Sequence, residues 1–293
     1  MAEESTSTFT LEPLGPFSLE AAARFWGGFT PASHPGLDPN GHLHMAFPVD
    51  GTWTPVGVCV RALDGGLTAY VYGDADRAVV CRQTARILSL DVDGRGLPDV
   101  GRRDPVAARL LERFPGLRPV CFYSPYEAGV WAIISHRIQM RQAAASKTRL
   151  AEAYGEEVSI HGQSVRAFPS PQVLVDVGEF PGLFGRKPDN IAAIASAALA
   201  GDLDAPALRA LSDEAALAHL RKLPGIGPFS SELILLRGAG HPDYLTLLEP
   251  RFRRAVQAAY ALDHEPTDAD LERISEAWRP YRMWITFLLR QQG

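Results

Sequence analysis

A glycine-rich segment, Leu223-Pro-Gly-Ile-Gly-Pro228, has the residue types that bind phosphate. It lies between two apolar stretches with helical spacing and therefore predicts a tight turn between two helices. Gly225 and Gly227 let the backbone approach a partner closely, and the free amides that begin the second helix lie at the positive end of its dipole. Arg221 and Lys222 add positive charge beside the turn. The alternative is an ordinary packing corner between helices.

A second segment, residues 129–149, is basic in a chain that is otherwise acidic. Its basic residues, with no acid among them, are Arg137, Arg141, Lys147 and Arg149. Cationic side chains supply the sequence-independent part of DNA affinity by contacting phosphates, so this segment indicates a nucleic-acid surface. A basic helix face in solvent is the alternative.

Three histidines, His34, His42 and His44, lie in a loop rich in proline and glycine. Their spacing alone allows a metal ion, but no cysteine or closing fourth ligand accompanies them, so we expect no metal site there. The cysteines of the chain are Cys59, Cys81 and Cys121. They form no CxxC pair, which excludes a zinc ribbon, a four-cysteine iron–sulfur cluster and a secreted disulfide framework.

The hairpin and the residues that follow it, Gly240-His-Pro-Asp-Tyr-Leu-Thr-Leu-Leu-Glu-Pro-Arg-Phe-Arg-Arg-Ala255, resemble the helix-hairpin-helix DNA glycosylase superfamily. Three more segments, 114–119, 127–134 and 278–284, resemble its 3-methyladenine DNA glycosylase II branch. The resemblance covers most of the chain and is strongest from about Phe114 to Trp284. It implies a DNA repair enzyme that flips a damaged, typically alkylated, base and hydrolyses its N-glycosidic bond.

The resemblance implies that Glu249 is the catalytic carboxylate. In the superfamily an aspartate in the pattern Asp-x-x-x-Arg-Arg stabilises the oxocarbenium ion that forms as the glycosidic bond breaks. The matching positions here are Glu249-Pro-Arg-Phe-Arg-Arg254, so glutamate stands in the aspartate's place. The extra methylene shifts the carboxylate, and a misplacement of about 1 Å can cost about 100-fold in rate. The alternative is that Glu249 only caps the helix that begins at Pro250.

The resemblance also implies a monofunctional enzyme that uses water as the nucleophile. Bifunctional members carry a lysine on the second hairpin helix, where this chain has Phe229, either close to the DNA and lesion pocket or in the core. The branch inserts an apolar side chain into the duplex from the segment that here reads Ser135-His-Arg137, and Arg137 could take that place. The expected DNA-contacting residues are Arg137, Arg221, Lys222, Gly225, Ile226, Gly227, Phe229, Ser230 and Arg251.

The expected lesion pocket departs most from the branch, in which electron-rich aromatics stack on a cationic alkylated base. The pocket residues expected here are Phe25, Trp131, Phe229, Leu233 and Arg290. Most of the aromatic cage is absent from this set. Trp131, Tyr123 and Trp284 could rebuild an aromatic wall, and the alternative for each is packing in the core. A cationic Arg290 beside a cationic base is unfavourable, so a neutral or bulkier damaged base is an alternative substrate.

No organic cofactor is expected. Members of the superfamily often bind a monovalent cation at the hairpin through backbone carbonyls, which here would be those of Arg221, Leu223 and Ile226. The expected partner is double-stranded DNA with a damaged base, and the expected form is a monomer. Two interpretations compete with a glycosylase. One is a non-catalytic protein of the same fold that binds damaged DNA, and the other is a helical protein without DNA affinity.

We expect an α+β N-terminal domain over residues 1–104. A mostly α-helical two-lobed body over residues 105–293 should follow it, with the hairpin at 213–238. An antiparallel sheet with helices is expected in the first part. The predicted strands are 43–47, 56–62 and 67–72. The predicted helices of the body begin at Pro105 and continue over 125–154, 190–200, 213–220, 228–238, 249–260, 268–277 and 280–291.

Composition limits the class of protein. The chain has 293 residues, 46% of them hydrophobic, which suffices for one large or two small domains with a sizeable core. The net charge of −5 argues against a protein that coats nucleic acid through bulk charge. No apolar run approaches the roughly 18 residues of a membrane span, and the N-terminus lacks the pattern of a signal peptide. We expect a cytoplasmic bacterial protein that acts at the nucleoid.

Overall fold

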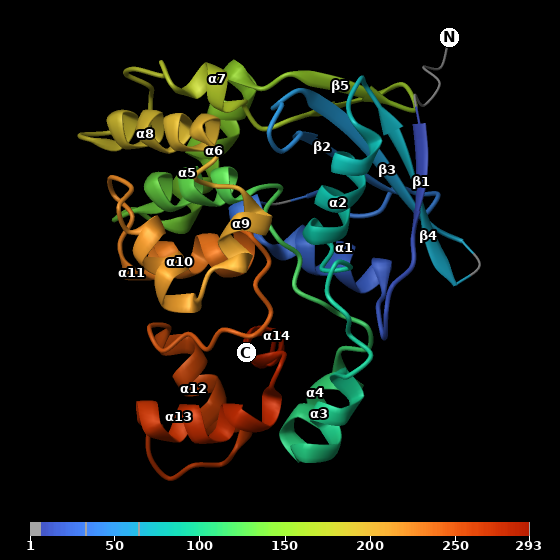
Figure 1. Ribbon diagram of the computed structural model, residues 1–293, viewed down its shortest axis with the longest axis vertical. Helices are drawn as coiled ribbons and strands as arrows, with labels where there is room; N and C mark the ends of the chain where they lie inside the picture. The colour runs from blue at the N-terminus through green and yellow to red at the C-terminus, as the bar shows by residue number, and fades with distance from the viewer. Residues whose placement is uncertain (1–6, 33, 64, 293) are drawn as a thin grey trace.

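The computed structural model describes residues 7–32, 34–63 and 65–292. A four-stranded antiparallel sheet with the spatial order β1-β4-β3-β2 forms its N-terminal part (Figure 1). Its strands are β1 (Ser7–Leu11), β2 (Leu43–Pro48), β3 (Pro55–Leu63) and β4 (Gly66–Tyr72). The pairing places Val58 opposite both Met45 and Val71, so alternate side chains form one apolar face.

Helices α1 (Leu19–Gly28) and α2 (Arg77–Ile87) pack on that apolar face. Ser18 and Asp76 cap them by accepting hydrogen bonds from amides of their first turns. On the opposite face lies a hairpin of β5 (Glu157–Ile160) and β6 (Gln163–Arg166), contributed by the helical body (Figure 1). The hairpin approaches so closely that a Cβ atom at Gly57 of β3 would lie 2.6 Å from the Ile160 side chain. The sheet is therefore covered on both faces.

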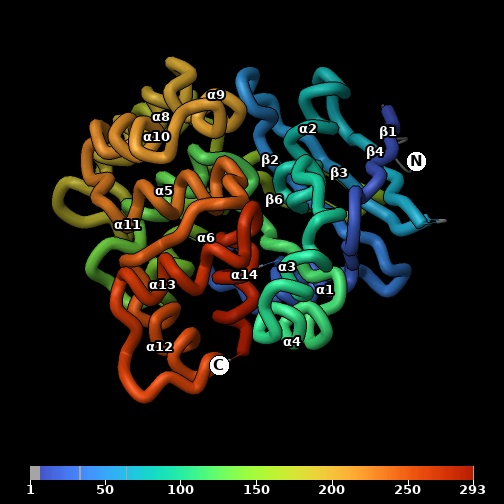
Figure 2. The backbone as a smooth tube through the Cα atoms, turned by 60° about the horizontal axis from the view of Figure 1, so that its bottom comes forward, coloured from blue at the N-terminus to red at the C-terminus, as the bar shows by residue number. Residues whose placement is uncertain are grey.

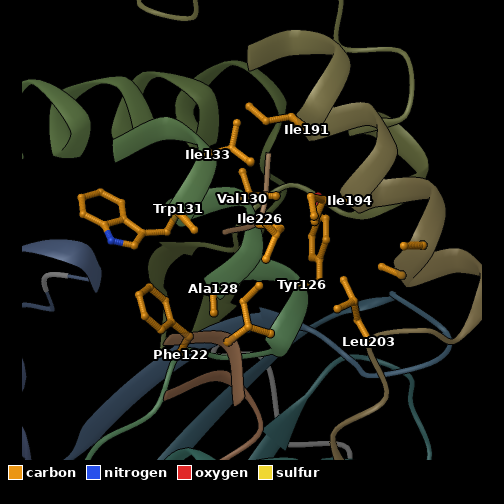
Figure 3. Packing of buried hydrophobic residues seen from close by; sticks show 14 of the residues in the cluster. Phe122, Tyr126, Ala128, Val130, Trp131, Ile133, Ile191, Ile194, Leu203 and Ile226 are labelled. Carbon is orange, nitrogen blue, oxygen red and sulfur yellow. The ribbon is translucent and has the colours of Figure 1, made fainter. Parts of the chain in front are cut away.

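The first helical lobe surrounds α5 (Pro125–Ser135), which is buried on all sides from Pro125 to Ile134. Figure 3 shows Val130 and Ile133 packing against Ile191 and Ile194. The other helices of this lobe are α6 (Met140–Tyr154), α7 (Pro171–Leu174), α8 (Lys187–Ala200), α9 (Ala205–Ala210), α10 (Asp213–Leu220) and α11 (Pro228–Leu233), which continues into a π-helical turn, Ile234–Gly238.

The second helical lobe packs around Trp278, Phe252 and Trp284. Its helices are α3 (Leu97–Arg103), α4 (Pro105–Arg113), α12 (Pro250–Ala259), α13 (Asp268–Ser275) and α14 (Arg282–Leu289). Figure 2 shows α3 and α4 beside α14, far from them in the sequence. Asp104 caps α4, and its Oδ2 accepts a hydrogen bond from Trp278 Nε1 at 3.0 Å. The Asp104 carboxylate therefore links the start of α4 to Trp278 near the C-terminal end of the lobe.

The expected fold class, an α+β domain followed by a mostly helical body, is confirmed. The predicted single helix over 125–154 is wrong, because His136 has an extended backbone and Arg137 has φ 57°, which separates α5 from α6. The predictions omitted β1, α1 and the β5–β6 hairpin. The domain boundary drawn at residue 104 lies between α3 and α4, which share one core.

Among the described residues, no helix has the length and apolar character needed to cross a bilayer.

Candidate active site

A cavity of about 550 Å³ opens between the two helical lobes, and α1 of the N-terminal domain contributes to its wall. Trp131 of α5 and Leu233 of α11 come from the first lobe, whereas Glu249 and Arg290 come from the second. The structure thus places most of the expected site residues together. Those that line the cavity are Phe25, Trp131, Arg137, Phe229, Ser230, Leu233, Glu249, Arg251 and Arg290.

Glu249 lies at the N-terminus of α12, with its side chain only 13% exposed. Its Oε1 accepts a hydrogen bond from the Arg251 amide at 3.4 Å, and its Oε2 lies 3.4 Å from Nη2 of Arg290. Pro250 occupies the first helical position, where a missing amide costs nothing. The carboxylate therefore caps its helix and also faces the cavity. A carboxylate in this setting can stabilise positive charge that develops on a bound molecule.

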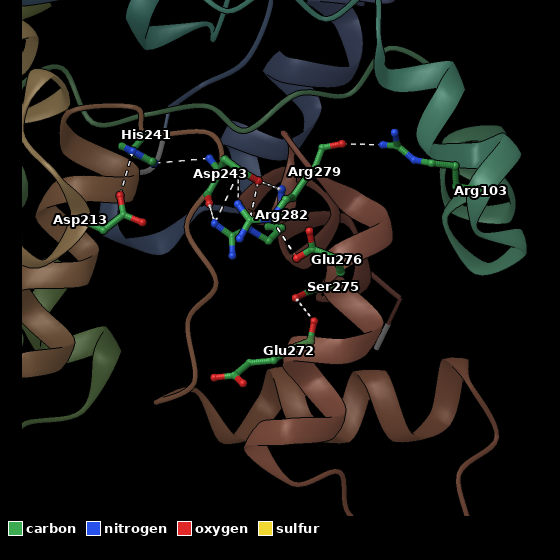
Figure 4. A network of polar contacts seen from close by, with 9 residues as sticks. All are labelled: Arg103, Asp213, His241, Asp243, Glu272, Ser275, Glu276, Arg279 and Arg282. Carbon is green, nitrogen blue, oxygen red and sulfur yellow. Dashed lines mark hydrogen bonds and ion pairs between the residues drawn. The ribbon is translucent and has the colours of Figure 1, made fainter.

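The segment that leads to Glu249 is held by a polar network around Asp243 (Figure 4). Asp243 Oδ1 accepts from the Arg282 amide at 3.1 Å and from its Nε at 3.0 Å, and Oδ2 accepts from Arg279 Nη1 at 3.0 Å. On the other side, His241 Nε2 lies 3.2 Å from Asp213 of α10. Both oxygens of Asp243 are used to anchor this segment, so its role is structural.

Arg237, which sequence reasoning missed, lies at the cavity among three phenylalanines. Its guanidinium carbon is 4.5 Å from the ring centroid of Phe29, 5.4 Å from that of Phe287 and 5.5 Å from that of Phe25. Its Nε donates to the Val120 carbonyl at 3.2 Å. Burial lowers the pKa of Arg237 to about 10, so it stays cationic at neutral pH. The aromatic surface of the cavity therefore already carries a cation.

The turn between α5 and α6 lies at the cavity mouth. Arg137 is exposed there with a left-handed backbone, and Met140 and Phe229 beside the mouth are 51% and 54% exposed. Large apolar side chains that remain exposed at the edge of a cavity often mark an interaction surface. The alternative interpretation, that Phe229 is buried in the core, is wrong. This arrangement offers one cation and two apolar groups to a molecule that lies across the mouth.

The turn of the hairpin, residues 221–227, lies outside the cavity lining, beside α5. Arg221 ends α10, and its Nε donates to Ser231 Oγ at 3.2 Å, while Lys222 and Gly225 are exposed. Ile226 is buried against Ile133 (Figure 3), so only its backbone can meet a ligand. The turn is closed by a hydrogen bond from the Ile226 amide to the carbonyl of Leu223 at 3.1 Å.

Replacing Gly225 with alanine is expected to destabilise the fold by about 1–3 kcal/mol. Gly225 has φ 80°, and a Cβ there would lie 2.5 Å from Nδ2 of Asn190 and 2.7 Å from Cδ1 of Ile133. Urea unfolding should show the lower midpoint. Gly227→Ala is the matched control, because open space surrounds that position, and its midpoint should stay close to the parent's. Equal midpoints for the two variants would contradict this role of Gly225.

Several charged and aromatic residues that the sequence suggested for the site form ion pairs or pack in the core instead. The phosphate interpretation of Lys147 is wrong, because its Nζ lies 2.5 Å from Glu127 and donates to the Pro31 carbonyl at 2.9 Å. Tyr123 packs on Trp26 with ring centroids 5.5 Å apart, and Trp284 lies in the core of the second lobe. Neither rebuilds a wall of the cavity, which instead uses Phe29 and Phe287.

No protein-family model matches the chain. Individual proteins do match it. A DNA-3-methyladenine glycosylase of Bacillus subtilis is 24% identical over 208 residues, which cover 68% of this chain and 67% of the relative. A probable bifunctional transcriptional activator/DNA repair enzyme AlkA of Mycobacterium tuberculosis is 29% identical over 204 residues, 69% of this chain but only 40% of that protein.

Solved structures show the same architecture. The 3-methyladenine DNA glycosylase of Archaeoglobus fulgidus superposes with a TM-score of 0.76 at 22% identity over 96% of this chain and 97% of the other. The chain has the fold of the helix-hairpin-helix DNA glycosylases and is similar in sequence to DNA-3-methyladenine glycosylases. The 8-oxoguanine glycosylase/lyase of Clostridium acetobutylicum, solved with double-stranded DNA, shares this superfamily fold with a TM-score of 0.68 at 16% identity over 99% and 97% of the two chains. The resemblance to the superfamily and its 3-methyladenine branch is thereby confirmed.

Proposed function

We propose that this chain is a DNA repair glycosylase that receives a damaged base in the 550 Å³ cavity and hydrolyses its N-glycosidic bond. The observation that carries the proposal is the position of Glu249, a largely buried carboxylate in a cavity lined by aromatic side chains. The relatives named DNA-3-methyladenine glycosylases support the same reaction class. We expect the protein to act at the bacterial nucleoid.

In the proposed reaction, the carboxylate of Glu249 stabilises the oxocarbenium ion as the bond between the sugar and the base breaks. The bond electrons leave with the base, and water then adds to the sugar carbon and gives its proton to solvent or to the departed base. Arg290, whose Nη2 lies 3.4 Å from Oε2, holds the carboxylate in place. Within the described part of the chain, no lysine lines the cavity. This composition supports a monofunctional enzyme that forms no Schiff base.

In the proposed complex, duplex DNA lies across the cavity mouth and the hairpin. The amides that begin α11 bind phosphate, with Arg221, Lys222 and Arg251 beside it, and Arg137 enters the duplex where the base has left. Gly227 has open space around it, which suits close approach of a phosphate. The carbonyls of Arg221, Leu223 and Ile226 are proposed to bind a monovalent cation at the same turn, and the protein is proposed to act as a monomer.

A non-catalytic protein that binds damaged DNA is the second candidate. Its support is the ion pair between Glu249 and Arg290, which occupies one oxygen of the carboxylate before any substrate arrives. In that case the cavity would hold a flipped base without cutting it free. The two candidates share the DNA surface and differ only in the chemistry at Glu249.

The test is release of free base from duplexes that contain 3-methyladenine, 7-methylguanine, hypoxanthine, ethenoadenine or bulkier alkyl purines. We expect release of free base, with the strand cut only after alkali treatment. Strand cleavage without alkali would contradict the monofunctional mechanism. Duplex binding without release on any lesion would favour the non-catalytic candidate, and a duplex affinity indifferent to salt would contradict both.

A further inference from the structure

We propose that His42, His44, Cys59 and His161 bind a zinc ion at a site remote from the cavity. One ligand atom from each of these four side chains lies within 4.8 Å of those of the others. The proposal is independent of the glycosylase activity, because none of these residues lines the cavity. The expectation that the histidine loop lacks cysteine and a fourth ligand holds for the local segment but fails in the folded chain.

The fold brings the four residues together from three places in the sequence. His44 of β2 and Cys59 of β3 are direct cross-strand partners, so their side chains share one face of the sheet. His42 precedes β2 by one residue, and His161 forms the tip of the β5–β6 hairpin with φ 53°. Ile160 beside the tip packs in one cluster with Cys59, which holds the hairpin on this face.

A ring nitrogen of His44 that lacks a hydrogen-bond partner is consistent with a bound ligand at this position. Its side chain is 9% exposed, and its Nε2 has no hydrogen-bond partner among the residues that the structure describes. A buried nitrogen without a partner is costly unless another group completes it. Cys59 is fully buried as a free thiol, and its sulfur is one of the four ligand atoms that lie within 4.8 Å of one another. Both are groups that a metal ion would satisfy.

Asp38 places a negative charge beside the cluster. Its Oδ1 is fixed by the amides of Asn40 at 2.8 Å and His42 at 2.9 Å. Its Oδ2 then lies 3.5 Å from Nδ1 of His42 and 3.7 Å from Nε2 of His44. A carboxylate this close to the cluster would offset part of the charge of a bound cation.

The donor set selects the metal. Imidazole nitrogen with one thiolate suits Zn²⁺, which prefers four such ligands in a tetrahedron, and four protein ligands leave no open position for catalysis. With Zn–N about 2.0 Å and Zn–S about 2.3 Å, ligand atoms must approach to roughly 3.5 Å of one another. Among the four, His161 is the exposed residue, so its side chain has the most room to adjust. Arg61, whose Nη2 is 2.9 Å from His161 Nε2, must release that nitrogen, while Tyr72 remains available as a partner for the other.

Binding would fasten the β5–β6 hairpin, a part of the helical body, to the N-terminal sheet. The test uses the full chain, purified, stripped with chelator and reloaded with Zn²⁺ or Co²⁺. We expect about one zinc per chain and, with Co²⁺, the intense visible bands of a tetrahedral thiolate complex. Added zinc should raise the unfolding temperature by roughly 5 °C at saturating metal.

Two variants test the ligand set against a matched control. Cys59→Ser should lose the thiolate-to-cobalt band, and His161→Ala, at the exposed tip, should weaken zinc binding at least about 10-fold. Cys81→Ser removes a thiol that lies elsewhere on α2 and should leave both signals unchanged. Substoichiometric metal after reloading, or cobalt bands that persist in Cys59→Ser, would overturn the proposal.

Discussion

Glu249→Gln is expected to lower base release by at least about 100-fold and to leave duplex affinity nearly unchanged. Glutamine keeps the volume of the side chain, and its carbonyl can still accept the hydrogen bond from the Arg251 amide that caps α12. What it loses is the negative charge that we propose stabilises the oxocarbenium ion, and removal of one preorganised electrostatic group costs about 100- to 1000-fold in other enzymes. Single-turnover base release measures the rate, and a fluorescence titration with duplex measures the affinity.

Glu249→Asp is the matched control, because it keeps the charge and shortens the reach. We expect it to retain far more activity than the glutamine variant. Equal rates for the parent and Glu249→Gln would show that the carboxylate serves only as a helix cap. Equal loss in both variants, with unchanged unfolding midpoints, would instead show that the position of the carboxylate matters as much as its charge.

Arg237→Met is expected to change which bases the cavity accepts. The guanidinium lies within 4.5 to 5.5 Å of three phenylalanine centroids, so it covers the aromatic faces that would otherwise attract a cationic base. Removing it restores a cation–π attraction of about 0.5–2 kcal/mol and removes a like-charge repulsion of about 3 kcal/mol at 5 Å and an effective dielectric constant of 20. Excision of 3-methyladenine relative to hypoxanthine should rise by about 10- to 100-fold.

Arg237→Lys keeps the positive charge and should leave that ratio close to the parent's. Arg237→Met loses both hydrogen bonds to the Val120 carbonyl and Arg237→Lys can keep at most one, so the urea midpoints of both variants should fall. The ratio of the two excision rates is therefore the informative measurement, since a general loss of stability lowers both rates together. An unchanged ratio in Arg237→Met would mean that the cation does not select the base.

The sequence predicted much of the site because the relevant signals are local. The glycine turn, the carboxylate before Pro250 and the aromatic at Phe229 each lie within a short motif, and the structure brings Glu249, Phe229 and Arg290 to one cavity. The roles of these residues in catalysis and DNA binding stay predictions. The strands from residue 43 to 72 followed from alternation and turns, with boundaries that shift by one residue.

The missed features depend on contacts between distant segments. Arg237 follows an apolar stretch, and nothing near it in the sequence reveals Phe25, Phe29 and Phe287 around its guanidinium. The histidine cluster is similar, because His161 lies far along the chain from His44 and Cys59. The turn His161-Gly162 between short alternating segments was the available signal for the β5–β6 hairpin.

The division of the cavity between two lobes has a kinetic consequence. Trp131, Phe229 and Leu233 belong to one lobe, whereas Glu249 and Arg290 belong to the other. If the proposed function holds, a base that contacts both halves is held with its sugar aligned to the carboxylate, whereas a base that contacts only one half lacks that alignment. Lesions should then differ more in the turnover rate of the bound complex than in its dissociation constant.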